Sequence, residues 1–272
     1  MDASSAQAGR YSPADFAARL LSRARIQHAR LTELPESVRP RSIDEAYHCQ
    51  SGVVRQLLDH YGGRIAGYKI ACTNTIAQRQ LSVDGPFSGN LLSAFCFDSP
   101  AHVTADQFFM RVVEAEFGFR MARDLPPISR PRTRDEVAEA VEGVIPGIEI
   151  VDSRFNDWTT IGALSLIADN ACNAAWVKGD IVADWRNIDL AAQPVKLSVN
   201  GKLVREGSGS AVLGHPLNAL EWLANSLASR DMGLQAGQFV TTGVTTEVYM
   251  GQQGDWITAD FGALGTATVV FE

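Results

Sequence analysis

Hydrophobic residues recur at helical spacing in the first sixty residues of the chain. Ser12-Pro13 resembles an N-cap with a first-turn proline, and an apolar stripe follows it: Phe16, Leu20, Leu21 and Ala24. Ser42 and Glu45 have the spacing of a capping box, ahead of a second apolar stripe that runs to Tyr61 and stops at Gly62-Gly63. The pattern therefore predicts two helices, which make a small N-terminal helical lobe over residues 1–63.

After residue 63 the pattern changes to short β-like runs separated by glycine and proline. The predicted strands are Ile65–Cys72, Phe95–Asp98, Met110–Phe119, Ile148–Val151, Val195–Val199, Leu203–Glu206, Phe239–Thr242, Trp256–Asp260 and Thr266–Phe271. Asn200-Gly201 predicts a two-residue hairpin, and two helices, Thr133–Glu142 and Pro216–Ala228, interrupt the strands. Because strands and helices do not alternate regularly, we expect an α+β domain over residues 64–272 with a mostly antiparallel or rolled sheet.

Charge and hydropathy exclude several classes of protein. The 272 residues include 24 Lys plus Arg and 31 Asp plus Glu, giving a net charge of −7 without a basic cluster, which argues against nucleic-acid binding. Residues 1–10 are polar and lack the apolar segment of a signal peptide. No apolar run approaches the roughly 20 residues of a spanning helix. We therefore expect a cytoplasmic protein that does not enter a membrane.

The cysteines and lysines are few. The four cysteines, Cys49, Cys72, Cys96 and Cys172, are scattered without metal-ligand spacing, so we interpret them as reduced packing residues. The lysines are Lys69, Lys178, Lys196 and Lys202. Lys69 lies within an apolar run, where its amine either extends to solvent or is held in a site that shifts its pKa for proton transfer.

Three glutamates suggest a metal site. Glu114 and Glu116 lie two residues apart, so in a strand they project from the same face. The ordinary interpretation is that they face water while the apolar residues between them face the core; a bound Mg²⁺ or Mn²⁺ is the alternative. Glu149 lies in an apolar run and should be paired, protonated or metal-bound, although Asp152 and Arg154 offer a purely structural pairing.

Other signatures of catalysis are missing from the sequence. It contains no dinucleotide or P-loop motif, no GxSxG elbow and no HExxH. Its five histidines never have metal-ligand spacing, which argues against a histidine-rich zinc site.

Six spaced motifs together resemble a known family. They are Gly67–Ile70, Val83–Pro86 with Gly89 and Leu91, Val113–Glu116, Ile148–Arg154, Ala168–Ala171 and Val212–Leu217. This set resembles the 2-oxopent-4-enoate hydratase and 2-oxo-3-hexenedioate decarboxylase branch of the fumarylacetoacetate hydrolase superfamily. The resemblance spans nearly the whole chain and is weakest before about Pro40. It implies a rolled mixed β-sheet behind a small N-terminal helical region.

The resemblance also implies roles for particular residues. It matches the metal-binding acids to Glu114, Glu116 and Glu149, with Mg²⁺ or Mn²⁺ as the cofactor. It matches Lys69 to the lysine beside the metal and Asp84 to an acid of the active-site loop, both placed to move a proton. The substrate-contacting segments correspond to Leu91, Asp169, Asn170, Thr242 and Gly243, with Gly89–Leu92 and Thr242-Gly243 expected as loops. His28 lies in a region comparable to that where C–C hydrolases of the superfamily carry a water-activating histidine, but its spacing is not diagnostic and a surface role is the favoured interpretation.

The implied substrate is a small open-chain 2-oxo acid from aromatic ring cleavage. Such an acid chelates the cation, which stabilises the enolate formed when the neighbouring carbon exchanges a proton. Hydration of a 2-hydroxypenta-2,4-dienoate is the favoured reaction. Because Phe87 stands where hydratases of this branch carry a second acid, two alternatives stay open: C–C hydrolysis of maleylpyruvate or fumarylpyruvate, and decarboxylation of 2-oxo-3-hexenedioate. The resemblance also suggests a homo-oligomer and association with a neighbouring pathway enzyme. A non-catalytic scaffold is disfavoured, since it has no reason to keep three acids and Lys69 around one point.

Overall fold

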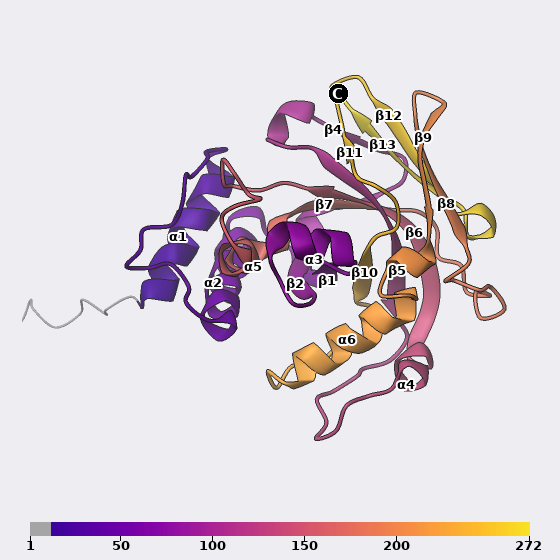
Figure 1. Cartoon of the computed structure of the whole chain (residues 1–272), viewed down its shortest axis with the longest axis horizontal. Coiled ribbons are helices and arrows are strands. Elements are labelled where there is room, and N and C mark those ends of the chain that lie inside the picture. Colours follow the sequence, from indigo (N-terminus) through magenta and orange to yellow (C-terminus); the bar gives the residue numbers. More distant parts are fainter. Residues whose placement is uncertain (1–11) are drawn as a thin grey trace, which may run out of the picture.

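Two helices form the N-terminal lobe, as the sequence predicts. The computed structural model describes residues 12–272, so the predicted polar character of residues 1–10 concerns residues outside this range. Helices α1 (Pro13–Ile26) and α2 (Ile43–Tyr61) lie side by side at one end of the molecule (Figure 1). The Ser12 hydroxyl accepts the N–H of Asp15, and Ser42 caps α2 in the same way.

The larger of two sheets carries the chemistry-bearing residues. Its strands are β1 (Ile65–Ala71), β2 (Phe87–Leu92), β3 (Cys96–Asp98), β5 (Val112–Met121), β6 (Val141–Val151), β7 (Asn173–Lys178), β10 (Phe239–Val244) and β11 (Tyr249–Met250). Their order is β2-β1-β10-β5-β6-β7-β3, with β11 also pairing with β5. The β1–β10 and β3–β7 pairs are parallel and the others antiparallel, so the predicted mixed sheet is confirmed.

A second, five-stranded sheet lies away from the helical lobe (Figure 1). Its order is β4 (Ala101–Val103), β13 (Thr266–Phe271), β12 (Trp256–Asp260), β8 (Pro194–Val199) and β9 (Lys202–Ser208). Asn200 and Gly201 join β8 to β9 with φ of 51° and 79°, which confirms the predicted hairpin. The remaining α-helices are α3 (Thr75–Leu81), α4 (Arg134–Ala138), α5 (Ala163–Ala168) and α6 (Pro216–Ala228).

The main core lies between one face of the large sheet, the second sheet and α6. A smaller core joins α1 and α2 to Phe155 and Ala168, so the helical lobe packs directly on the rest of the chain. The division into domains at residue 63 coincides with the Gly62-Gly63 turn before β1 and stays a prediction. Within residues 12–272, no helix combines the length and apolar character needed to cross a bilayer.

The outer edge of β2 is covered by side chains rather than by another strand. The Ser88 N–H donates to the Tyr47 hydroxyl (3.0 Å), and the Ser88 carbonyl accepts from Gln50 Nε2 (2.8 Å). Two residues along, the Asn170 side chain accepts from the Asn90 N–H (2.7 Å) and donates to the Asn90 carbonyl (2.9 Å). These three side chains satisfy backbone groups that a neighbouring strand would otherwise pair.

Some predicted boundaries were wrong. Helix α4 ends at Ala138 and β6 begins at Val141, so the predicted helix to Glu142 was too long and the predicted strand Ile148–Val151 too short. Pro146-Gly147 has the appearance of a break in the sequence. Pro146 nevertheless lies within β6, just beyond the last β6–β7 pair, where no β7 residue is opposite it. Strands β2, β4, β7 and β11 and helices α3 and α5 were not predicted.

Candidate active site

The β5–β6 pairing brings three glutamates together on one face of the sheet. Glu114 lies directly opposite Glu149, and Glu116 lies opposite Gly147. Since alternate residues of a strand share a face, Glu114 and Glu116 project to the same side as Glu149. One carboxylate oxygen from each of the three lies within 4.8 Å of the other two. This separation suits a single cation held between them.

These acids do not face bulk water. Glu116 and Glu149 are fully buried and Glu114 is half-buried. The interpretation in which Glu114 and Glu116 face water was therefore wrong. Burial raises the pKa of Glu114, and burial together with the charges of Glu149 and Glu114 raises that of Glu116 well above its usual value. The three glutamates thus place more negative charge at the site than the surrounding protein groups neutralise.

Lys69 supplies the positive charge nearest to these acids. Its Nζ lies 3.2 Å from Glu149 Oε1 and donates to the Ala171 carbonyl (3.1 Å), and the residue is 2% exposed. Burial lowers the pKa of Lys69, but the charges of Glu149, Glu114 and Glu116 outweigh burial and leave it above the usual range. Lys69 is therefore an ammonium group in this arrangement, and it does not extend to solvent.

Each buried glutamate has one oxygen held and one oxygen without a partner. Asn173 Nδ2 donates to Glu149 Oε1 (2.9 Å), and the Gly243 N–H donates to Glu116 Oε2 (2.9 Å). Glu149 Oε2 and Glu116 Oε1 are buried and make no hydrogen bond. Leaving a buried carboxylate oxygen without a partner is costly. Carboxylate oxygens with this arrangement suit a hard divalent cation such as Mg²⁺ or Mn²⁺.

Two threonine hydroxyls near these strands are also buried without partners. Thr241 lies opposite Lys69 in the β1–β10 pair, and its Oγ1 makes no hydrogen bond. Thr73 Oγ1 is likewise unpaired and packs against Gly243, where a Cβ would approach it to 1.9 Å. The sequence analysis assigns no role to either threonine or to Asn173. Their positions depend on strand order and register, which the sequence pattern does not reveal.

A left-handed turn holds the Ala171 carbonyl against Lys69. Asn170, Ala171 and Cys172 have consecutive φ values of 52°, 51° and 57°, a conformation that L-residues other than glycine adopt rarely. The turn packs so tightly on Gly89 that a Cβ there would lie 2.4 Å from the Asn170 carbonyl oxygen. Side-chain bonds from Asn170 to β2 hold the turn in this strained form.

The predicted substrate-contacting residues have different surroundings. Asp169 is buried, and its Oδ1 lies 2.7 Å from Arg154 Nε. The carboxylate and the guanidinium therefore neutralise each other in an internal ion pair. Thr242 donates from Oγ1 to the Phe117 carbonyl (2.9 Å), and Gly243 contacts Glu116; both lie within β10 rather than in a loop. Leu91 packs in a small apolar cluster with Trp176, and it lies in β2, which corrects the expected loop over Gly89–Leu92.

Two predicted proton-transfer residues lie outside the acid cluster. Asp84 is exposed between α3 and β2, and within the described part of the chain it makes no hydrogen bond or ion pair. His28 is exposed, and its ring packs on Phe109 with centroids 4.0 Å apart. Neither residue contacts a glutamate of the cluster through an interaction found in the structure.

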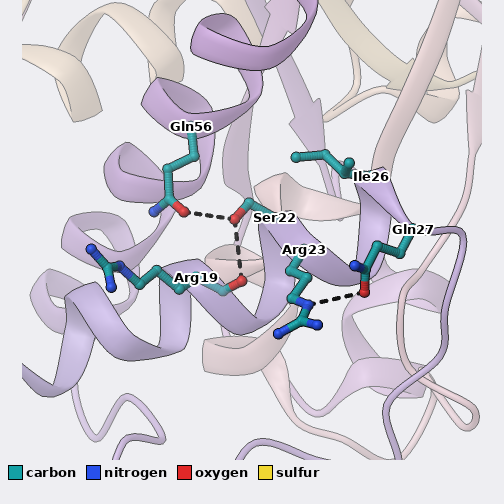
Figure 2. A pocket seen from close by; sticks show the side chains of 6 residues that line it. All are labelled: Arg19, Ser22, Arg23, Ile26, Gln27 and Gln56. Carbon is teal, nitrogen blue, oxygen red and sulfur yellow. Dashed lines mark hydrogen bonds between the residues drawn. The ribbon is translucent and has the colours of Figure 1, made fainter.

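A surface hollow on the helical lobe is unrelated to these acids. Figure 2 shows the hollow, of about 450 Å³, along α1 and α2. Its polar side chains bond to one another: Ser22 donates to Gln56 (2.9 Å) and Arg23 to Gln27 (3.0 Å). No carboxylate lines it, so it offers no metal ligand.

A comparison with protein families decides the relationship of this chain. The family model "Fumarylacetoacetate (FAA) hydrolase C-terminal" matches residues 102–271. The chain belongs to the fumarylacetoacetate hydrolase family. The match includes β5, β6 and β10, so the glutamates and Gly243 all lie within the segment typical of the family.

Curated relatives from the fumarylacetoacetate hydrolase family are enzymes. A 2-keto-4-pentenoate hydratase of Paraburkholderia xenovorans is 34% identical over 231 residues, 85% of this chain and 84% of that protein. A 2-hydroxyhexa-2,4-dienoate hydratase of Comamonas testosteroni is 34% identical over 85% of this chain and 86% of its own. A 4-oxalocrotonate decarboxylase of Pseudomonas putida is 31% identical over 80% of this chain and 81% of its own. The relatives thus include both hydratases and decarboxylases.

Solved structures from the same family share the fold. The 4-oxalocrotonate decarboxylase from Pseudomonas putida G7, complexed with magnesium and adipate, superposes with a TM-score of 0.88 at 28% identity, covering 95% of this chain and 97% of that one. A fumarylpyruvate hydrolase from Pseudomonas aeruginosa, in complex with Mn²⁺ and pyruvate, has a TM-score of 0.58 at 14% identity, covering 75% and 89%. The second likeness shows the fold alone.

Proposed function

We propose that this protein is a divalent-metal-dependent hydratase acting on 2-hydroxypenta-2,4-dienoate or a close analogue. The observation that carries the proposal is the cluster of Glu114, Glu116 and Glu149, with two bare buried oxygens, beside the Lys69 ammonium. The hydratase names of relatives that align over most of the chain support this choice of reaction.

The three glutamates would hold the cation, Mg²⁺ or Mn²⁺. When bound, the cation supplies a Lewis acid that polarises the keto-acid end of the substrate. Asn173 and the Gly243 N–H orient Glu149 and Glu116 so that one oxygen of each points away from its protein partner. Magnesium and calcium in two solved structures of 4-oxalocrotonate decarboxylase from Pseudomonas putida G7 support a divalent ion for this chain.

Lys69 would move the proton at the carbon next to the keto group. Its Nζ is held between Glu149 and the Ala171 carbonyl, so the position of the donor atom is fixed before substrate enters. A bound cation would neutralise part of the negative charge of the three glutamates. This would lower the pKa of Lys69 and make its proton easier to transfer. Asp84 is proposed as a second proton-transfer group on the loop before β2, and His28 has no assigned step.

Decarboxylation of 2-oxo-3-hexenedioate is the second candidate reaction. The observation in its favour is the close superposition with 4-oxalocrotonate decarboxylase over nearly the full length of both chains. C–C hydrolysis receives no comparable support, because the fumarylpyruvate hydrolase matches in fold only.

A product assay separates these reactions. The enzyme is stripped with EDTA and assayed with Mg²⁺ or Mn²⁺ on 2-hydroxypenta-2,4-dienoate, 2-oxohex-3-enedioate and fumarylpyruvate. Loss of dienol absorbance without CO₂ release indicates hydration, CO₂ indicates decarboxylation, and pyruvate indicates C–C hydrolysis. Glu149→Gln should abolish metal-dependent turnover, whereas Glu142→Gln, on the exposed end of the same strand, should not. Full activity of Glu149→Gln or of the EDTA-treated enzyme would contradict the proposal.

Cytoplasmic location, a homo-oligomeric state and association with a neighbouring pathway enzyme are also parts of this proposal. The resemblance in sequence supports the homo-oligomeric state and the association. Cell fractionation and light scattering of the purified protein test the first two, and co-purification with the preceding or following enzyme tests the third.

A further inference from the structure

A second cavity lies behind the strand that carries Lys69. It measures about 280 Å³ and is bounded by α2, β1, β2 and the segment after α6, with Gln50, Val54, Tyr68, Asn90, Arg230 and Met232 among its lining residues. Tyr68 and Lys69 are neighbours in β1, so their side chains project to opposite faces of the sheet. The cavity is therefore separate from the glutamate cluster, which contributes no residue to its lining.

Arg230 is a cation without an acid partner in this cavity. Its guanidinium lies over the Tyr47 ring, 3.7 Å from the centroid, and its Nε donates to the Ser226 carbonyl (3.2 Å). Its Nη2 is buried and makes no hydrogen bond. Among residues 12–272, no carboxylate forms an ion pair with Arg230. A planar guanidinium binds oxyanions such as carboxylates best, and the half-buried guanidinium of Arg230 has no such partner among the described residues.

The remaining lining residues define the kind of anion. Burial raises the pKa of Tyr68 although the charge of Arg230 opposes this, so the phenol keeps its proton as a donor near the guanidinium. Val54, Leu58, Ile65 and Met232 give the cavity an apolar wall. Arg55 and Asp59 also line it, and Arg55 forms an ion pair with Asp15 (3.9 Å). An oxyanion attached to a short hydrocarbon chain matches this combination better than a compact inorganic ion.

We propose that this cavity binds a short-chain monocarboxylate, with its carboxylate on Arg230 and Tyr68 and its chain along the apolar wall. The carboxylate accepts hydrogen bonds from the guanidinium and the phenol, which satisfies the charge of Arg230. The site is distinct from the metal-dependent reaction and does not depend on the identity of that reaction.

The site also borders the residues that hold Lys69. Asn90 donates from Nδ2 to Gln50 (3.0 Å), and both side chains line the cavity. The backbone of Asn90 is bonded to Asn170, which begins the left-handed turn that presents the Ala171 carbonyl to Lys69. A ligand in the cavity would therefore contact residues that support this turn.

Calorimetric titration tests the proposal on the full-length enzyme with Mg²⁺ and saturating oxalate, which would chelate the Mg²⁺ held by the glutamates and so block that site. We expect hexanoate to bind in the millimolar range, with affinity reduced about tenfold in Arg230→Met and less in Tyr68→Phe. Arg41→Met is the control, because Arg41 is an exposed arginine outside the cavity lining; the hexanoate affinity of this variant should be unchanged. Arg230→Lys, which keeps the charge without the planar fork, guards against a folding defect and should show an intermediate loss.

A crystal soaked with 6-bromohexanoate locates the ligand through the anomalous signal of bromine. A peak in the cavity, with the carboxylate beside Arg230, is the expected result. Absence of hexanoate binding, equal affinity in Arg230→Met, or a bromine peak elsewhere would overturn the proposal. Binding of inorganic phosphate in preference to hexanoate would overturn the assignment of a monocarboxylate.

Discussion

The two faces of β5 show how one strand serves two purposes. On one face, Val113, Ala115 and Phe117 are fully buried in the main core, where the Phe117 ring meets Phe261 edge to face with centroids 5.0 Å apart. On the other face, Glu114 and Glu116 meet Glu149 and Lys69. The apolar face lowers the free energy of the folded chain through burial, whereas the polar face raises it through desolvated charge. We therefore expect substitutions on the two faces to separate stability from activity.

The largest effect on activity should come from Lys69→Arg. Arginine keeps the positive charge but does not release a proton at working pH, so turnover should fall on the order of a thousandfold. Steady-state kinetics with Mg²⁺ on the preferred substrate measures this loss. Lys196→Arg on β8, where the side chain is exposed, is the control and should retain full activity. Activity of Lys69→Arg within tenfold of the unmodified protein would contradict a proton-transfer role.

Substitution on the opposite face should affect stability instead. Phe117→Ala removes a fully buried ring and should lower the free energy of unfolding by about 3–5 kcal/mol, measured by urea denaturation. The metal affinity of the folded fraction should be unchanged.

The matched variant on the polar face is Glu114→Gln, which removes one of three mutually repelling carboxylates. It should leave the metal-free free energy of unfolding unchanged or higher while weakening metal binding. Equal loss of stability in both variants would show that the faces are not separable.

Asn173 tests how much the held oxygens contribute to the polar face. Asn173→Ala removes the donor to Glu149 Oε1, and we expect metal affinity to fall about 10- to 100-fold. Mn²⁺ binding followed by electron paramagnetic resonance measures this directly, without relying on turnover. Asn156→Ala, at an exposed asparagine, should bind Mn²⁺ normally. An unchanged Mn²⁺ affinity in Asn173→Ala would mean that Glu149 does not need this hydrogen bond.

The smallest expected effect is a change in how the free energy of unfolding depends on pH. It concerns the start of α6, the helix that covers the apolar face of the large sheet. Burial and the charge of Arg134 hold the pKa of His215 below its usual value, and its Nδ1 accepts the N–H of Leu217 (3.0 Å) at the start of the helix. The unfolded chain therefore takes up the proton more readily than the folded one. This stabilisation is complete above the unfolded pKa of about 6.5 and is lost as pH falls through the lower folded value.

His215→Asn keeps a helix-capping acceptor without this titration. The decline in stability between about pH 7 and pH 5 should be smaller in the variant, by less than about 1 kcal/mol. Urea denaturation at several pH values measures it. An identical pH dependence in the two proteins would show that His215 does not contribute to it.

Local pattern predicted the elements whose sequences agree with their packing. The stripes of α1, α2 and α6 and the alternation along β5 indicated both element type and buried face. Strand β2 has the sequence Phe-Ser-Gly-Asn-Leu-Leu, and the family resemblance led us to expect a loop over Gly89–Leu92. The local pattern does not reveal that side chains of residues far away in sequence satisfy the outer edge of this strand. Strand β7 begins Asn-Ala-Ala, which has little intrinsic preference for a strand, and burial in the sheet overrides that preference.

The site was predictable in part for the same reason. The spacing of Glu114 and Glu116 indicates a shared face, but their meeting with Glu149 requires the β5–β6 register, and the sequence supplied it only through family resemblance. The donation from Asn173 to Glu149 depends on a left-handed turn of non-glycine residues, which no propensity favours. Asp169 appeared available for substrate in the sequence because its pairing with Arg154 is a tertiary contact.

The side chains along β2 have a consequence for self-association. An open strand edge is a template onto which a second chain can add, and proteins commonly block such edges. Asn170 bonds to both backbone groups of Asn90, while Tyr47 and Gln50 bond to Ser88, so this stretch of β2 offers no free backbone partner there. Asn170 thus serves both the active site and the protection of the β2 edge. Replacing it would free the turn beside Lys69 and would also expose the backbone groups of Asn90 to pairing with another chain.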